Sequence, residues 1–105
     1  MVRISAIKYL NTIPFIYGLE NSPIVDEIVM DFCSPAESAE NLLFDRSDVG
    51  IVPVAIIPSL PDAHIISDYC IGATDNVASV LLCSGVPLKE IRLIKMDGDS
   101  RTSQL

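Results

Sequence analysis

The chain has 105 residues, of which half are hydrophobic and 20% are charged, as expected for one modest globular domain. Its formal net charge of −7 offers no basic surface to a phosphate backbone or an anionic membrane, so we expect neither as a partner. The richest apolar run, residues 51–57, is broken by Pro53 and is too short to cross a bilayer, and the N-terminus lacks the pattern of a signal peptide. The sequence therefore predicts a cytoplasmic location.

The cysteines and the single histidine offer little for nucleophilic or metal chemistry. Cys33, Cys70 and Cys83 are an odd number without a CxxC pair, which argues against a disulfide framework and against a zinc site. We expect each of them to be a small buried hydrophobic residue. His64 follows a Pro-Asp-Ala run on a predicted loop remote from the strand ends, so we interpret it as structural or solvated.

A strand, a loop and a short helix are predicted first along the chain. Residues 2–7 alternate and are rich in branched side chains, as in a strand, and Tyr-Leu-Asn-Thr at residues 9–12 ends that pattern. In the helix that follows, we expect the Thr12 hydroxyl to cap the first turn, Pro14 to lie within that turn, and Gly18 to end the helix.

A second strand and a second helix are predicted next. Residues 27–32 have strand character, and Ser34 and Glu37 have the spacing of a capping box that starts a helix. Apolar side chains at three- and four-residue spacing then give one buried face, formed by Ala36, Ala39, Leu42 and Leu43. We interpret the charged side chains of this region as a solvated helix face and turn, rather than as a paired acid and base: Glu37, Glu40, Asp45, Arg46 and Asp48.

The rest of the chain is predicted to add strands to a largely parallel sheet. The strand predicted at residues 48–54 is continuously apolar after Asp48 rather than alternating, which is typical of a strand covered on both faces, and residues 55–60 make a brief helical turn. Further strands are expected at residues 65–66, 78–83 and 91–96. The alternation of strands and helices indicates an α/β fold, in which ligands sit beyond the carboxyl ends of the strands.

Several blocks of the sequence carry a resemblance to a known family. Residues 5–19 resemble the opening of chorismate dehydratases, in which a strand ends in Tyr-Leu-Asn-Thr and a Pro-Phe pair follows. Further blocks match in the same order, at residues 48–55, 69–73, 77–84 and 100–103. The resemblance covers the entire chain.

This resemblance implies the type II periplasmic-binding-protein fold, with two α/β lobes around a cleft, in proteins more than twice as long. It implies that residues 1–97 form an incomplete first lobe and that residues 98–105 begin the crossover into a second lobe. The last six residues read as the first turn of a helix with nothing after it, so the sequence looks truncated. We expect the isolated fragment to be inactive, because a two-lobed cleft then loses half its contacts and its exclusion of water.

The family reaction removes water from chorismate and gives 3-[(1-carboxyvinyl)oxy]benzoate on the futalosine route to menaquinone, without a metal or organic cofactor. By resemblance, Asn11 and Ser79 match active-site residues that hydrogen-bond the substrate and steady the leaving hydroxyl. The alternative interpretation is that Asn11 forms a turn and that Ser79 is a small core serine bonded to backbone.

Substrate contacts are expected at two further places. Tyr9 and Thr12 flank Asn11, although packing and helix capping are the alternative uses of these two side chains. The closing run offers free N–H groups, hydroxyls and a guanidinium to a carboxylate, or else a simple cap with a solvated arginine: Ser100, Arg101, Thr102 and Ser103. No base stands out among these residues, so a carboxylate of chorismate itself is a hypothetical proton acceptor.

Three other interpretations stay open. The related dihydroxynaphthoate synthase shares the architecture but resembles a Ser-Pro-Cys-Pro-Asn-Asp-Thr first loop, which this chain lacks. A non-catalytic solute-binding protein would close on a small anion, and the missing signal peptide counts against it. The third interpretation is a truncated product without activity, in which case the site residues describe the parent enzyme.

Overall fold

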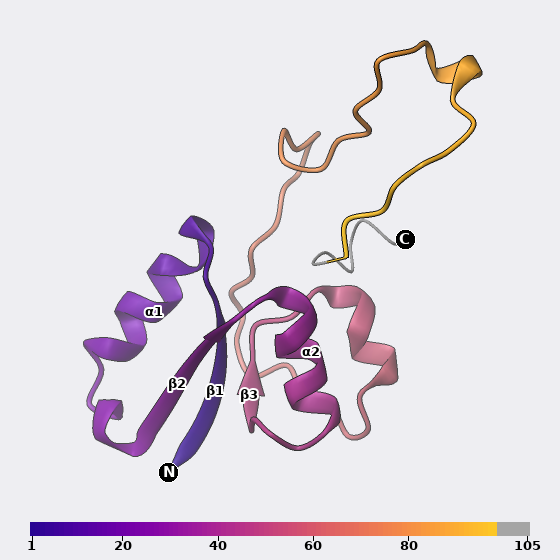
Figure 1. Cartoon of the computed structure of the whole chain (residues 1–105). Helices are drawn as coiled ribbons and strands as arrows, with labels where there is room; N and C mark the ends of the chain where they lie inside the picture. Colours follow the sequence, from indigo (N-terminus) through magenta and orange to yellow (C-terminus); the bar gives the residue numbers. More distant parts are fainter. Residues whose placement is uncertain (99–105) are drawn as a thin grey trace.

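The computed structural model describes residues 1–98 and contains one small α/β unit followed by a long extended segment (Figure 1). The regular elements are β1 (Val2–Ile7), α1 (Ile13–Glu20), β2 (Ile28–Cys33), α2 (Pro35–Leu43) and β3 (Val49–Gly50). Short 3-10 turns occupy Leu10–Thr12, Val25–Glu27, Val54–Ser59 and Leu88–Glu90. The turn at Val54–Ser59 confirms the helical turn predicted for residues 55–60.

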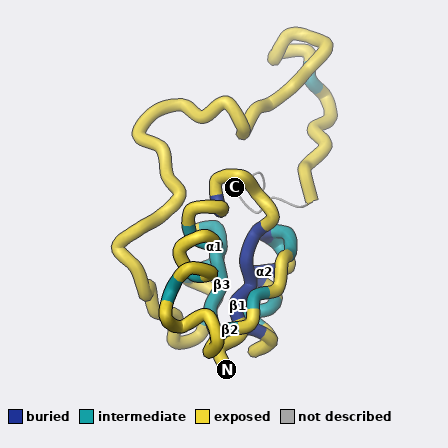
Figure 2. The backbone as a smooth tube through the Cα atoms, turned by 90° about the vertical axis from the view of Figure 1, so that its left-hand side faces the viewer, coloured by how far each residue is buried: buried dark blue, intermediate teal, exposed yellow. Residues whose placement is uncertain are grey.

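The three strands form a parallel sheet in the order β2-β1-β3. β1 pairs with β2 along its whole length, from Val2 opposite Ile28 to Ile7 opposite Cys33, but it pairs with β3 only through Ile4 and Ser5. Figure 2 shows the sheet between α1 on one side and α2 on the other. The predicted α/β class is therefore confirmed as a mixed structure with a small parallel sheet, whereas the periplasmic-binding-protein-like lobe stays a prediction.

The core lies around the central strand. The buried hydrophobic residues are Ile4, Ala6, Ile7 and Ala39. Polar side chains are buried beside them, at Ser5, Thr12, Ser38 and Ser47. This small core packs α2 against β1 and leaves much apolar surface elsewhere in contact with water.

The capping box of α2 is confirmed. The Ser34 hydroxyl accepts from the Glu37 backbone N–H at 3.2 Å, and the Glu37 carboxylate accepts from the Ser34 N–H at 2.7 Å. The Ser34 backbone hydrogen bond lowers the pKa of Glu37 below its ordinary range. The charged side chains expected in water, from Glu37 to Asp48, are exposed.

Two expectations for α1 are wrong. Thr12 precedes the helix but already has helical backbone angles, and its side chain makes no capping hydrogen bond, because a capping residue needs an extended backbone to turn its hydroxyl onto the first turn. Gly18 does not end the helix, which runs on to Glu20. A glycine inside a helix costs only about 1 kcal/mol relative to alanine, too little to stop α1 by itself.

The strands expected after residue 50 are also absent from the described residues. Residues 48–54 form a strand only at Val49–Gly50, and the segments 65–66, 78–83 and 91–96 are not strands. A strand persists only within a hydrogen-bonded ladder, and no neighbour within residues 1–98 pairs with these segments. Residues 61–98, called the arm below, instead leave the sheet as an extended chain (Figures 1 and 2).

The arm explains the unusual dimensions of the molecule. Its radius of gyration is 16.3 Å, whereas a compact chain of this length has about 13 Å. Cys70 and Cys83 lie in the arm and are exposed, so the expectation of buried cysteines is wrong for both, while Cys33 is half-buried. His64 is exposed, as expected, and its Nδ1 lies 2.6 Å from the Asp62 carbonyl oxygen. Within residues 1–98, no helix has the length and apolarity needed to span a bilayer.

Candidate functional site at the carboxyl ends of the strands

The candidate site is the loop that follows β1, residues 8–12. β1, β2 and β3 run parallel, so their carboxyl ends lie together at one end of the sheet, where α/β proteins place their ligands. The loop is tied to the end of β2, because the Lys8 N–H donates to the Cys33 carbonyl at 3.4 Å. It then closes into a 3-10 turn in which the Thr12 N–H donates to the Tyr9 carbonyl at 3.0 Å.

The loop presents one exposed amide and one buried hydroxyl. Asn11 is exposed, so its carboxamide can donate to and accept from a ligand. Tyr9 is half exposed. Thr12 is fully buried, and its Oγ1 has no hydrogen-bond partner among the described residues. The structure thus places the three predicted site residues of this loop together, as neighbours on one turn.

A cluster of buried polar side chains fixes the strand that carries the loop. The Ser5 hydroxyl lies 2.6 Å from that of Ser47 and accepts from the Asn41 amide at 3.0 Å. The Ser38 hydroxyl donates to the Ile51 carbonyl at 2.9 Å. These bonds connect β1, α2 and the chain around β3, so the loop begins three residues beyond a pinned position.

Gly50 lets α2 lie close to the sheet. A Cβ at this position would stand 2.9 Å from Leu42 Cδ1 and 3.1 Å from Ser38 Oγ. Only glycine avoids that clash without a shift of the helix or of the Leu42 side chain. The capped start of α2 lies beside the carboxyl end of β2, because Ser34 directly follows Cys33.

Lys8 is a site candidate that the sequence analysis missed. It is exposed, it begins the loop, and its positive charge helps to lower the pKa of Glu37 at the start of α2. An ammonium group on the same loop as an exposed amide suits a carboxylate ligand. Its position directly after the predicted strand, one residue before Tyr9, was the available signal.

Among the described residues, one further predicted site residue is not joined to this loop. Ser79 is exposed in the arm, and no hydrogen bond within residues 1–98 joins it to the loop. The substrate-binding residues expected at 100–103, namely Ser100, Arg101, Thr102 and Ser103, lie outside the described residues. The geometry therefore assembles the Tyr9, Asn11 and Thr12 part of the predicted site and leaves Ser79 away from it.

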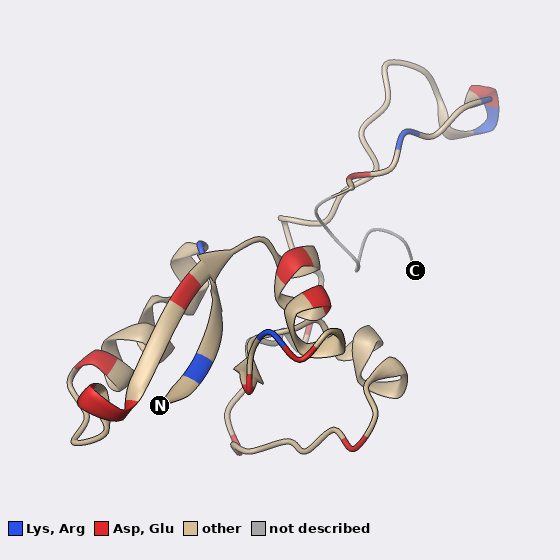
Figure 3. Cartoon of the chain, turned by 60° about the horizontal axis from the view of Figure 1, so that its bottom comes forward, with Lys and Arg blue, Asp and Glu red and all other residues tan. Residues whose placement is uncertain are grey.

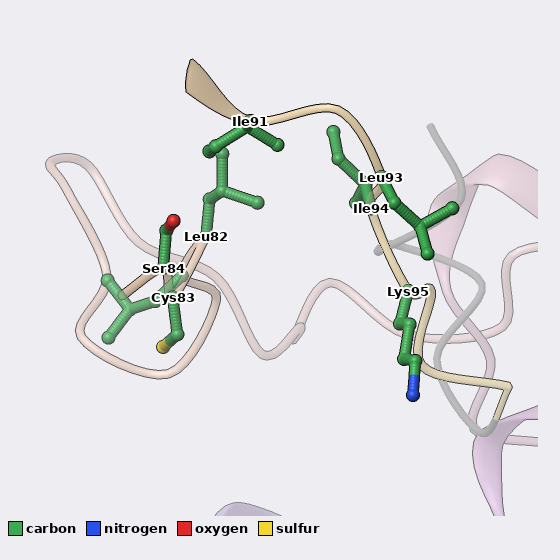
Figure 4. A pocket seen from close by; sticks show the side chains of 8 residues that line it. Leu82, Cys83, Ser84, Ile91, Leu93, Ile94 and Lys95 are labelled. Atoms are coloured by element: carbon green, nitrogen blue, oxygen red, sulfur yellow. The ribbon is translucent and has the colours of Figure 1, made fainter. Parts of the chain in front are cut away.

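The arm carries a separate apolar hollow of about 410 Å³ (Figure 4). Residues 81–84 form one wall, and Ile91 with residues 93–95 forms the other. In Figure 4, Leu82 and Ile91 approach each other, and Lys95 lies at the far end. None of the predicted site residues lines this hollow. Across residues 1–98, no group of three or more His, Cys, Asp or Glu side chains is placed to hold a metal ion.

The opposite end of the sheet, where β1 begins, is held by an ion pair that the sequence analysis also missed. Arg3 donates to both carboxylate oxygens of Asp48, at 3.1 and 2.8 Å, and its second partner is Asp45, at 3.4 Å. The Arg3 side-chain and backbone hydrogen bonds lower the pKa of Asp48 from 3.8 to about 2. This contact joins the start of β1 to the approach of β3, at the end of the sheet away from the loop.

Comparison with known proteins identifies the family. The chain matches the model of a family described as menaquinone biosynthesis over residues 2–105. No solved structure matches the chain. The match agrees with the resemblance carried by the Tyr-Leu-Asn-Thr loop. The chain therefore belongs to the menaquinone biosynthesis family, and its role lies in that pathway.

Proposed function

We propose that the chain supplies the first-lobe part of a site that dehydrates chorismate to 3-[(1-carboxyvinyl)oxy]benzoate on the futalosine route to menaquinone. The observation that carries the proposal is the exposed Asn11 carboxamide at the carboxyl end of β1, in a chain of the menaquinone biosynthesis family. Lys8 on one side and the buried Thr12 hydroxyl on the other add a cation and an unpartnered polar group.

The chemistry of the reaction fits these residue types. Chorismate is a dianion, so a site for it needs cations or neutral donors, and Lys8 and Asn11 provide one of each. In the elimination, one C–O bond and one C–H bond of the ring break, and the C–H electron pair completes the aromatic ring. The hydroxyl leaves with a proton as water. A donor such as the Asn11 amide stabilises the charge that develops on the departing oxygen.

The proton acceptor is proposed to be a carboxylate of the substrate. Residues 8–12 contain no histidine, aspartate or glutamate, and the single histidine, His64, lies in the arm. Discovery of an essential ionisable side chain in a second lobe would refute this step. In the same proposal Ser79 contacts the substrate, and the run at residues 100–103 holds a carboxylate, once a second lobe closes the cleft.

The test is conversion of chorismate, followed by liquid chromatography and mass spectrometry. We compare the chain alone with the chain extended by the second lobe of a chorismate dehydratase, and expect product from the extended protein. In that protein, Asn11→Ala or Ser79→Ala should lower kcat/KM by about 10²–10³, the usual effect of losing one transition-state donor. Asn76→Ala and Ser59→Ala are matched controls at exposed positions and should leave kcat/KM unchanged.

The outcomes separate the competing functions. Binding of chorismate without conversion by the extended protein would favour a solute-binding protein. Neither binding nor conversion would refute the substrate assignment. Normal activity of Asn11→Ala would refute the role of the loop, even if chorismate is the substrate.

A further inference from the structure

The arm combines strand-like sequence with unpaired backbone. Residues 91–96 have the composition of a strand, yet no strand pairs with them in the described structure. No backbone hydrogen bond joins them to residues 81–84 across the hollow of Figure 4. Leu93 is 78% exposed, and Ile94 and Met96 are more than half exposed. Within the described chain, only the Ile91 N–H of this segment is engaged, by donation to the Leu88 carbonyl at 3.3 Å, and an apolar segment whose other N–H and C=O groups lack a ladder partner can add to a sheet edge.

The α/β unit offers such an edge. β2 is the outer strand of the sheet and extends over six residues, whereas the other outer strand, β3, has only two. Apolar side chains of β2 are also open to water, since Val29 and Phe32 are both about two-fifths exposed. A six-residue strand could pair along the whole of β2 but hardly along β3.

The charges of the two segments are complementary (Figure 3). Residues 88–96 contain three cations, Lys89, Arg92 and Lys95, and one acid. Residues 1–60 contain eight acids and three cations, and two of the acids, Glu27 and Asp31, lie beside or within β2. The ion pairs found among the described residues are those of Arg3 with Asp45 and Asp48, so neither Arg92 nor Lys95 is paired with another described residue.

The arm of the same chain extends away from β2 (Figure 1). A second copy carries the same arm and the same edge, so reciprocal exchange forms a closed two-fold dimer without any further component. We propose that residues 91–96 of one copy add a strand to the outer edge of β2 of a second copy, with Arg92 on the sheet face that carries Asp31 and Lys95 on the opposite face, because side chains alternate between the faces along a strand. This inference does not depend on the reaction proposed above.

A charge-exchange experiment tests the pairing on the full chain. One variant reverses the arm, Arg92→Glu with Lys95→Glu, and the other reverses the strand, Glu27→Lys with Asp31→Lys. Each variant alone brings like charges together, and we expect its dimer Kd, from sedimentation equilibrium, to be at least about tenfold weaker than that of the unaltered chain. An equimolar mixture of the two restores opposite charges at both interfaces and should dimerise again.

Matched controls change the same charges elsewhere. Lys89→Glu lies in the arm outside the pairing segment, and Glu40→Lys lies on α2, so each should leave the dimer Kd within about threefold. Recovery in the mixture also shows that both variants are folded. A monomeric unaltered chain at ~100 μM, well above the micromolar Kd of an ordinary specific interface, would overturn the proposal. So would a dimer that resists both reversals, or a mixture that fails to recover although each variant keeps its far-UV circular dichroism.

Discussion

Replacing Ser5 by alanine should destabilise the α/β unit although it removes a single oxygen atom. The Ser5 side chain is fully buried on the central strand. Its hydroxyl lies 2.6 Å from the Ser47 hydroxyl and 3.0 Å from the Asn41 amide nitrogen. The substitution leaves both partners facing a methyl group.

The cost can be estimated from the burial of those two partners. Ser47 is only 6% exposed, so its hydroxyl cannot turn to water, and an unsatisfied buried group costs about 1–3 kcal/mol. Asn41 is half-buried, so its amide can form a hydrogen bond to water instead. Losing its bond to Ser5 therefore costs about 1 kcal/mol. We expect Ser5→Ala to lower the free energy of unfolding by about 2–3 kcal/mol, which for a unit of this size lowers Tm by roughly 10–20 °C.

Urea and thermal unfolding, followed by far-UV circular dichroism, measure this effect. Ser59→Ala is the matched control, because Ser59 is exposed and its side chain bonds to no described residue; it should change the free energy of unfolding by less than about 0.5 kcal/mol. The double variant Ser5→Ala with Ser47→Ala should cost less than the two single changes added, since no buried hydroxyl then faces a methyl group. Equal stability of Ser5→Ala and Ser59→Ala would refute the proposed role of the buried polar cluster.

Three further predictions concern other contacts of the same unit. Gly50→Ala should lower the free energy of unfolding by about 1–3 kcal/mol in urea, because the new methyl overlaps Leu42; an unchanged midpoint would show that the side chain simply moves aside. Asp48 has a pKa lowered to about 2 by Arg3, so its stabilisation is present above pH 3.8 and is lost as the pH falls through about 2. Urea midpoints measured over that range should therefore fall more steeply for the unaltered chain than for Asp48→Asn, and parallel curves would contradict this. Ser34→Ala removes the helix cap and should cost about 1 kcal/mol with a loss of helical circular dichroism, whereas Ser34→Thr should retain most of both.

Local signals in the sequence were sufficient for the elements that depend on neighbours in the chain. The capping box of Ser34 and Glu37 spans three residues and starts α2 as predicted. β1 and the loop after it were also predictable, because a strand pattern ends where Tyr9 begins. The position of Asn11 at the carboxyl end of β1 follows from these two facts.

Contacts between distant residues were not predictable in this way. Ser5 and Ser47 are 42 positions apart, and Arg3 and Asp48 are 45 apart, so only the folded chain brings each pair together. The segment 78–83 failed as a strand for the converse reason: its composition favours a strand, but no partner in the described structure completes a ladder. The place of Ser79 relative to Asn11 therefore could not be predicted from composition.

Titration of the isotope-labelled chain with chorismate, followed by amide NMR shifts, tests the candidate site most directly, because it detects weak binding without requiring turnover. We predict saturable shifts for the amides of residues 8–12 and of Ser34 at the adjoining start of α2. The amide shifts of Arg3 and Asp48, at the opposite end of the sheet, should stay unchanged. Shifts confined to the arm or to that opposite end of the sheet, or no shifts at millimolar chorismate, would contradict the assignment of the loop after β1 as the substrate site.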